Sequence, residues 1–176
     1  MKTYMNDSVS NIRTYLNTLP QTPVVYKWWF KEIPQAVSCH SQINLNAIDK
    51  RVFDRTTYYA LYVGIGVDCR MRFKWHINQK HTQSNVKAGV LSTLRQTLSA
   101  LLGIDMTQSE QAVNDYINKN CLIEWQTYPN YTKVQLENIE TQTIKNGYYP
   151  LNIVKNRTMD KSWLKDLKAL RKNYKK

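Results

Sequence analysis

Residues 58–64, YYALYVG, decide the fold together with residues 24–30, VVYKWWF. Both stretches are rich in the β-branched and aromatic residues that favour strands, and one begins after Pro23 while the other ends in Gly64. The segment 32–57 between them is far longer than a hairpin loop, and insertions of that length are usually functional or mobile. The sequence therefore predicts two paired strands separated by an insertion.

The rest of the chain shows mainly the apolar spacing of helices. Helices are predicted over residues 7–19, 69–77, 86–102, 107–120, 131–145 and from 160 onward. Gly103 is expected to end the third of them. Thr107 and Glu110 have the spacing of a capping box, which indicates the start of the fourth.

A third strand is predicted over residues 121–127, CLIEWQT. The expected fold class is mixed α/β (α+β), with a small, mainly antiparallel three-stranded sheet flanked by helices. Its strands lie near residues 23–31, 58–64 and 121–127. A chain of 176 residues can bury one hydrophobic core and is short for two ordinary domains, so residues 1–176 are expected to form a single domain.

The formal net charge is +12, from 25 Lys and Arg against 13 Asp and Glu. Such a surface attracts polyanions, so nucleic acid is the first partner to consider, although an acidic protein or a membrane surface would also suit it. Residues 155–176 hold nine Lys or Arg and two Asp, and so contribute +7 of this charge. A basic C-terminal helix is therefore predicted over residues 158–176.

The three cysteines, Cys39, Cys69 and Cys121, are widely spaced and form no C-x-x-C pattern. Neither a disulfide framework nor a structural zinc site is indicated. The first residues are too polar for a secretory signal, and no apolar run approaches the roughly 18 residues of a membrane span. We expect a cytoplasmic protein with no membrane partner.

Several polar residues recur at spacings that indicate one site. Arg72 lies ten residues after Tyr62 and four before His76. Residues four apart in a helix share a face, so Arg72 and His76 are expected to point the same way. Asn152 lies twelve residues after Glu140.

These segments resemble the successive motifs of GIY-YIG nucleases. The resemblance rests on PVVY (23–26), LYVG (61–64), RFKWH (72–76), and LENIE (136–140) through PLN (150–152). It covers residues 23–153, with 32–57 as an insertion. Val24 stands where the first motif names glycine, and Thr143 stands where the Glu-containing helix often has leucine. The resemblance implies one active site formed by Tyr26, Tyr62, Arg72, His76, Glu140 and Asn152.

The activity implied by this resemblance is endonucleolytic cleavage of double-stranded DNA with one Mg²⁺ or Mn²⁺ per active site, leaving a 5′-phosphate. Tyr26 is the expected general base for the attacking water. Tyr62 and His76 would position that water or relay its proton. A phenol acts as a base only if a metal ion and Arg72 lower its pKa from about 10.

Glu140 is the expected metal ligand. Leu136 and Ile144 lie four positions before and after it, so its helix face points inward, where an unpaired carboxylate is costly. A divalent cation would stabilise it, and so would an ion pair with an arginine, which is the commoner outcome for a lone buried glutamate. Asn152 is expected to hold Tyr26 or Glu140 by a hydrogen bond, or else to belong to an ordinary turn.

Arg72 offers a planar fork that can bind two phosphate oxygens. Five further basic residues are expected to bind nucleic acid: Lys74, Lys80, Arg95, Lys165 and Arg171. Lys74 and Lys80 flank the helix of Arg72 and would contact backbone phosphate without reading sequence. Arg95 lies on a largely apolar helix, so a buried ion pair and a DNA contact are both open.

Two other functions are open. A catalytically inactive nucleic-acid-binding module would keep the fold and the charge but tolerate loss of Glu140 or Arg72. A basic protein-interaction domain would use the amphipathic segment 163–174 to dock on an acidic partner, and its binding would be insensitive to salt. For a nuclease, DNA recognition would depend on residues 32–57, residues 103–130, the basic C-terminal helix or a homodimer, and a restriction-like role is expected.

Overall fold

The computed structural model describes residues 4–175, which form a five-stranded antiparallel sheet in the order β1-β5-β2-β4-β3. The strands are β1 (Tyr4–Ser8), β2 (Val24–Phe30), β3 (Lys50–Phe53), β4 (Thr56–Gly66) and β5 (Cys121–Thr127). The three predicted strands are β5, β2 and β4, which are neighbours in the middle of the sheet. The predicted number of three is wrong, because β1 and β3 are added at the two edges.

The edge strands escape prediction because little of either is buried. The first three residues of β3, KRVF, are exposed, and β1, YMNDS, is largely polar. Short polar edge strands discourage pairing with other chains, but they show no alternation of apolar residues. β3 lies within the 32–57 insertion, which also contains α2 (Gln35–Ser38) and the 3-10 helix η2 (Leu45–Ala47).

The register of β2 and β4 brings two tyrosines to one face of the sheet. Tyr26 pairs with Gly64, and Trp28 pairs with Tyr62. Since side chains alternate along a strand, Tyr62 and Gly64 face the same side. Tyr26 and Tyr62 are therefore diagonal neighbours on that face.

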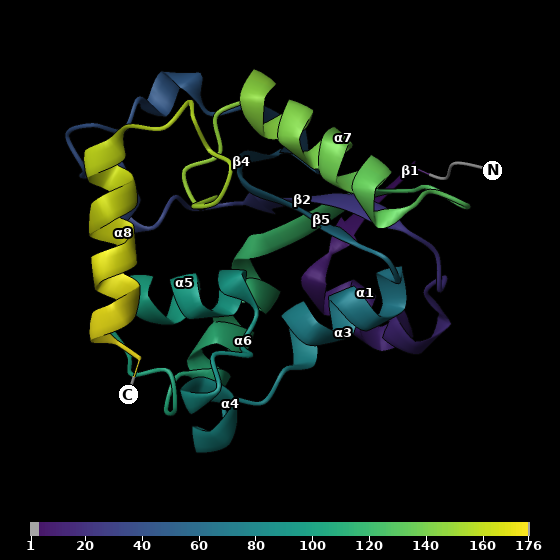
Figure 1. The fold of residues 1–176 in the computed structure, drawn as a ribbon, viewed down its shortest axis with the longest axis horizontal. Coiled ribbons are helices and arrows are strands. Elements are labelled where there is room, and N and C mark those ends of the chain that lie inside the picture. The colour runs from purple at the N-terminus through teal and green to yellow at the C-terminus, as the bar shows by residue number, and fades with distance from the viewer. Residues whose placement is uncertain (1–3, 176) are drawn as a thin grey trace.

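Helices cover both faces of the sheet, as Figure 1 shows. α7 (Lys133–Asn146) crosses one face. The other face is covered by α1 (Val9–Tyr15), α3 (Cys69–Asn78), α5 (Thr93–Leu101) and α6 (Glu110–Asn120), with the 3-10 helix η1 (Leu16–Thr18) following α1. α8 (Lys161–Asn173) stands beside α5 at one end of the molecule. Each face of the sheet consequently has its own apolar core, a larger one under α1, α3, α5 and α6 and a smaller one under α7.

The single helix predicted over residues 86–102 is wrong, because the chain forms two helices there. α4 (Gln83–Lys87) ends before Gly89, whose φ of +70° suits a glycine and stops the helix. α5 then begins after Ser92, whose side chain accepts a hydrogen bond from the Arg95 N–H. The predicted capping box of Thr107 with Glu110 does not form either, since α6 begins at Glu110 itself.

The apolar face of α8 is covered by the protein itself. Trp163 and Leu167 are buried in the larger core, and the Trp163 indole N–H donates to the Pro150 carbonyl over 2.8 Å. Any acidic partner would therefore meet the exposed basic side chains of α8, such as Lys165 and Lys168, and not its apolar face. Among the described residues, no helix has the length and apolarity needed to cross a membrane.

Candidate active site

Tyr26 is buried in the middle of β2, and its ring lies directly over Gly64. A Cβ built on Gly64 would be 2.5 Å from the Tyr26 hydroxyl oxygen and 2.7 Å from Cζ. Only glycine permits this approach without a shift of the ring. The rings of Phe73 and His76 also pack edge-on against it, with ring centroids 5.6 Å and 5.3 Å away. The Tyr26 hydroxyl is thus held at one place in the site.

That hydroxyl lies between two functional groups of α3. Arg72 Nε donates to it over 2.8 Å, and His76 Nε2 lies 2.6 Å from it. The arginine N–H donates to the hydroxyl oxygen, and in the His76 tautomer that carries its hydrogen on Nδ1 the hydroxyl donates its own proton to Nε2. Burial raises the pKa of Tyr26, and the charge of Arg72 opposes part of that rise.

His76 is fixed by contacts on its other ring nitrogen. Nδ1 lies 3.2 Å from Ser92 Oγ, so in the tautomer with its hydrogen on Nδ1 the ring donates to the serine while Nε2 accepts from Tyr26. Burial, followed by the charges of Arg72 and Arg95, holds the pKa of His76 well below its usual value. His76 is therefore neutral at pH 7, with Nε2 available to accept a proton.

Arg72 is positioned by the start of α3. The Asp68 carboxylate accepts the Met71 N–H over 2.8 Å and so caps the helix. A Cβ built on Gly66 would lie 2.7 Å from Arg72 Cβ, so this glycine leaves room for the arginine stem. Burial raises the pKa of Tyr62, and the charge of Arg72 acts against that rise. Arg72 thus acts on both tyrosines.

Glu140 joins the same group from α7. Its side chain is 17% exposed, and Oε2 lies 3.4 Å from Lys155 Nζ. Burial raises the pKa of Glu140, while Lys155 and then Arg72 oppose that rise. The Glu140 charge in turn contributes to the raised pKa values of Tyr26 and Tyr62. The carboxylate therefore lies within electrostatic reach of Arg72 and both tyrosines.

The surroundings of Glu140 fit one hydrated divalent cation. Among residues 4–175, no three His, Cys, Asp or Glu side chains form a metal-binding group. The Glu140 carboxylate has one long hydrogen bond, to Lys155, so oxygen lone pairs are left for a ligand. Mg²⁺ and Mn²⁺ prefer oxygen, and Mg²⁺ usually keeps several waters, so one carboxylate and a phosphate suffice to bind them. The sequence left two partners open for Glu140, an ion pair with an arginine or a divalent cation. The ion pair is with Lys155 instead of an arginine, and it leaves room for the cation.

Asn152 acts on the backbone of β4. The Val63 N–H donates to Asn152 Oδ1 over 2.9 Å, and Asn152 Nδ2 donates to the Val63 carbonyl over 2.8 Å. The expected hydrogen bond to Tyr26 or Glu140 is wrong, because both ends of the amide are used here. β3 pairs only with residues 56–59 of β4, so Asn152 continues the pairing along that edge, next to Tyr62. It links the loop after α7 to the strand that carries Tyr62.

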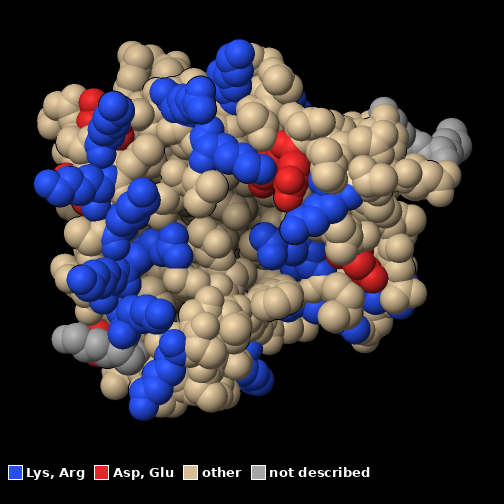
Figure 2. Space-filling view, viewed as in Figure 1, with Lys and Arg blue, Asp and Glu red and all other residues tan. Residues whose placement is uncertain are grey.

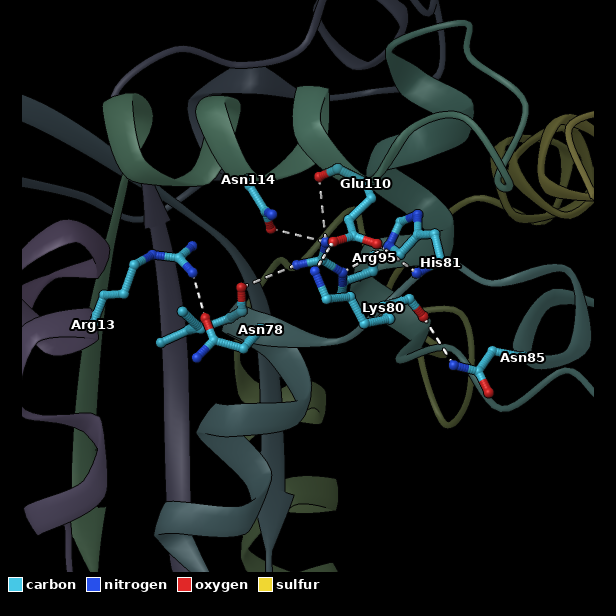
Figure 3. Close-up of polar contacts among 9 residues, drawn as sticks. Arg13, Asn78, Lys80, His81, Asn85, Arg95, Glu110 and Asn114 are labelled. Atoms are coloured by element: carbon cyan, nitrogen blue, oxygen red, sulfur yellow. Dashed lines mark hydrogen bonds and ion pairs between the residues drawn. The ribbon is translucent and has the colours of Figure 1, made fainter.

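Arg95 is a buried structural residue, and the expected DNA contact is wrong for it. Figure 3 shows its guanidinium surrounded by polar groups of α3, α6 and the loop after α3. It donates to His81 Nε2 over 2.7 Å, to the His76 carbonyl over 2.9 Å and to Asn114 Oδ1 over 2.9 Å. Burial lowers the pKa of Arg95 to about 10. No phosphate can reach a side chain that is 1% exposed.

The other basic residues expected to bind DNA lie closer to the surface. Lys80 is exposed and pairs with Glu110 over 2.8 Å, Lys74 is half-buried on α3, and Lys165 is exposed on α8. Arg171 donates to Gln96 over 2.6 Å, and its charge acts to lower the pKa of Tyr62. Figure 2 shows Lys and Arg side chains gathered along α8, across a hollow from acidic side chains beside α7. Their DNA contacts stay predictions.

Sequence reasoning missed Ser92 and Lys155. A serine before an apolar helix is a capping signal, which identifies Ser92 as the start of α5. Its contact with His76 spans 16 positions and an intervening helix, and no local pattern reports such a contact. Lys155 lies in a loop with φ of 62°, among many other lysines of the basic C-terminal region.

One comparison with known proteins identifies a family for this chain. A model of the GIY-YIG catalytic domain matches residues 24–173, which is most of the chain. No curated protein and no solved structure shows significant similarity to it. The matched range begins at β2 and includes every residue of the candidate site. The chain therefore belongs to the GIY-YIG catalytic domain family.

Proposed function

We propose that this chain is a metal-dependent endonuclease that hydrolyses phosphodiester bonds of double-stranded DNA. GIY-YIG enzymes are nucleases that act on DNA and generally depend on a divalent metal ion. The observation that carries the proposal is the hydrogen-bonded series from Arg72 through the Tyr26 hydroxyl to His76, with the Glu140 carboxylate in electrostatic reach. Each requirement of phosphodiester hydrolysis has a group in this set.

Activation of the attacking water falls to Tyr26. Its hydroxyl lies 2.6 Å from His76 Nε2, so with the imidazole hydrogen on Nδ1 it can take a proton from water while it passes its own to Nε2. A free phenolate would be unfavourable here, because burial raises the pKa of Tyr26. The coupled transfer avoids it by forming an imidazolium, which the lowered pKa of His76 opposes. The negative charge of the phosphate bound beside it would offset that cost, and Ser92 would accept the Nδ1–H.

Stabilisation of charge falls to Arg72 and Glu140. The terminal nitrogens of Arg72 would bind the non-bridging phosphate oxygens, as a guanidinium fork does elsewhere. Tyr62 would position the water beside them. Glu140 would hold one Mg²⁺ or Mn²⁺, which would supply positive charge to the phosphate and the leaving oxygen. The expected product end is a 5′-phosphate.

Purified protein incubated with supercoiled plasmid provides the test. We expect nicking or cutting with Mg²⁺ or Mn²⁺, none with excess EDTA, and at least about 10²-fold slower cleavage by Arg72→Ala, the scale of one lost transition-state contact. Lys87→Ala, at an exposed position at the end of α4, is the control for loss of a positive charge and should cleave like the parent. Binding of DNA by the parent without any cleavage would instead support the inactive binding module.

A further inference from the structure

An apolar cleft of about 310 Å³ opens beside Arg72, between the end of β4, the outer side of α3 and the start of α7. Its apolar side chains are Ile65, Val67, Met71 and Trp75, and Lys133 also lines it. Val67 is 59% exposed, Met71 57% and Trp75 43%. Met71 and Trp75 are four residues apart in α3, so they lie side by side on one face of the helix.

Trp75 differs from the other tryptophans. Trp28, Trp29, Trp125 and Trp163 are all at most 2% exposed. The Trp75 indole N–H donates to the Val90 carbonyl over 3.1 Å, which anchors the ring while leaving part of it in solvent. A cluster of exposed apolar side chains around an anchored aromatic ring is typical of a binding surface.

Arg72 connects this cleft with the candidate active site. Its side chain lines the cleft, while its Nε donates to the Tyr26 hydroxyl over 2.8 Å. The base and the phosphate of a nucleotide are joined by one sugar, so a phosphate bound by Arg72 leaves its base within reach of the cleft. The surrounding charge suits that ligand, because Lys133 and Arg72 are cationic and the one carboxylate in the lining, Asp68, caps α3.

We propose that the cleft binds a nucleobase next to the scissile phosphate, stacked on Trp75 and flanked by Met71. The proposal rests on the proposed function and narrows its substrate class. A base paired within an intact duplex cannot enter the cleft, and removing it from the stack costs a few kcal/mol, least when it is mismatched or unpaired. The preferred substrate is therefore DNA with an unpaired base beside the cleavage position.

Binding of 2-aminopurine oligonucleotides in EDTA tests the cleft apart from cleavage. One duplex carries a bulged 2-aminopurine, and the other carries the same base fully paired. Stacking of a base on an aromatic side chain contributes about 1–3 kcal/mol. We therefore expect the parent to bind the bulged duplex at least about 5-fold more tightly and to quench its fluorescence.

Trp75→Ala should lose this preference and this quenching while binding the paired duplex as the parent does. Trp75→Phe should keep part of the preference for the bulged duplex and part of the quenching. Val154→Ala changes an exposed apolar residue that does not line the cleft, so it should bind and quench like the parent. Unchanged thermal unfolding of the variants shows that they are folded. Equal binding of the two duplexes by the parent, or an equal effect of Trp75→Ala on both, would overturn the proposal.

Two further results separate the interpretations. A parent that prefers the bulged duplex but never cleaves DNA with Mg²⁺ contradicts the proposed endonuclease and leaves the cleft assignment standing. A parent that cleaves but shows no preference contradicts the cleft assignment alone. If sedimentation shows a dimer that Trp75→Ala converts to a monomer, the cleft is covered by a second copy of the chain, and the proposal is overturned.

Discussion

The Tyr26 hydroxyl oxygen lies 2.6 Å from His76 Nε2, a contact between residues 50 positions apart. Arg72 donates to the same oxygen, and the hydroxyl proton bridges to the imidazole when the hydrogen of His76 is on Nδ1. Burial acts on the two groups in opposite senses, raising the pKa of Tyr26 and lowering that of His76. Both are therefore neutral at pH 7, and together they form an acceptor for the proton of the attacking water.

Removal of the Tyr26 hydroxyl tests this pairing. Tyr26→Phe keeps the ring that packs on Phe73 but cannot relay a proton. We expect kcat for plasmid nicking to fall by about 10²-fold or more, the usual contribution of a positioned acid or base, with little change in KM. Thermal unfolding confirms that the variant is folded. A folded variant with the kcat of the parent would remove Tyr26 from the mechanism.

Gly64 is predicted to be required for the position of the same hydroxyl. In Gly64→Ala the new methyl group would be 2.5 Å from the Tyr26 oxygen, so the ring must shift. A displacement of this kind costs an enzyme about 10²-fold in rate. Steady-state cleavage kinetics measure it, with Ala60→Gly on the same strand as a control for altered strand stability. Parental activity in Gly64→Ala would show that the hydroxyl tolerates displacement.

Arg95 is predicted to contribute to stability rather than to DNA binding. Arg95→Met removes the donor to the His76 carbonyl, His81 and Asn114. Because these acceptors are then left unpaired, we expect the free energy of unfolding to fall by about 3 kcal/mol. Urea unfolding measures it, and Arg157→Met, at an exposed arginine, should change the free energy of unfolding by less than about 0.5 kcal/mol. Comparable stability of the two variants would contradict the structural role of Arg95.

The titration of His81 is predicted to make the free energy of unfolding depend on pH. Burial, with a further contribution from Arg95, lowers its pKa to about 4. Between pH 6.5 and 4 the unfolded chain therefore binds a proton that the folded protein does not, so the free energy of unfolding falls as pH drops through this window. The slope for one histidine is at most about 1.4 kcal/mol per pH unit.

His81→Gln removes this titration and leaves the other groups in place. The difference in the free energy of unfolding between the parent and His81→Gln should be greatest above pH 6.5. It should decrease as the pH is lowered to about 4.5. Urea unfolding at a series of pH values measures the difference. A difference that does not change with pH would mean that His81 titrates alike in the folded and unfolded chain.

The sequence was sufficient for the middle of the sheet and insufficient for its edges. β2, β4 and β5 are predictable because buried strands need β-branched and aromatic residues over their whole length. β1 and β3 are mostly exposed or polar, so pairing with a neighbour rather than burial makes them strands. The break at Gly89 was missed because the apolar spacing continues past it, and the positive φ of that glycine is a property of the folded chain.

For the site, the family motifs identified the groups but not the contacts that orient them. The spacing in α3 fixes Arg72 and His76 on one side of a helix, which is a local property. The contact of Ser92 with His76 and that of Asn152 with Val63 depend on which loops meet, across 16 and 89 positions. The sequence could not decide between burial and DNA contact for Arg95, because a lone arginine on an apolar helix is consistent with either.

The central claim is that Glu140 holds a divalent cation in a site that hydrolyses DNA. The most direct measurement is the Mg²⁺-dependent rate of plasmid cleavage by Glu140→Ala beside Glu137→Ala, whose side chain is on the same helix, 40% exposed and paired with Lys133. We predict at least about 10²-fold loss for Glu140→Ala and a parental rate for Glu137→Ala. Equal Mg²⁺-dependent cleavage by the parent and Glu140→Ala would contradict the account.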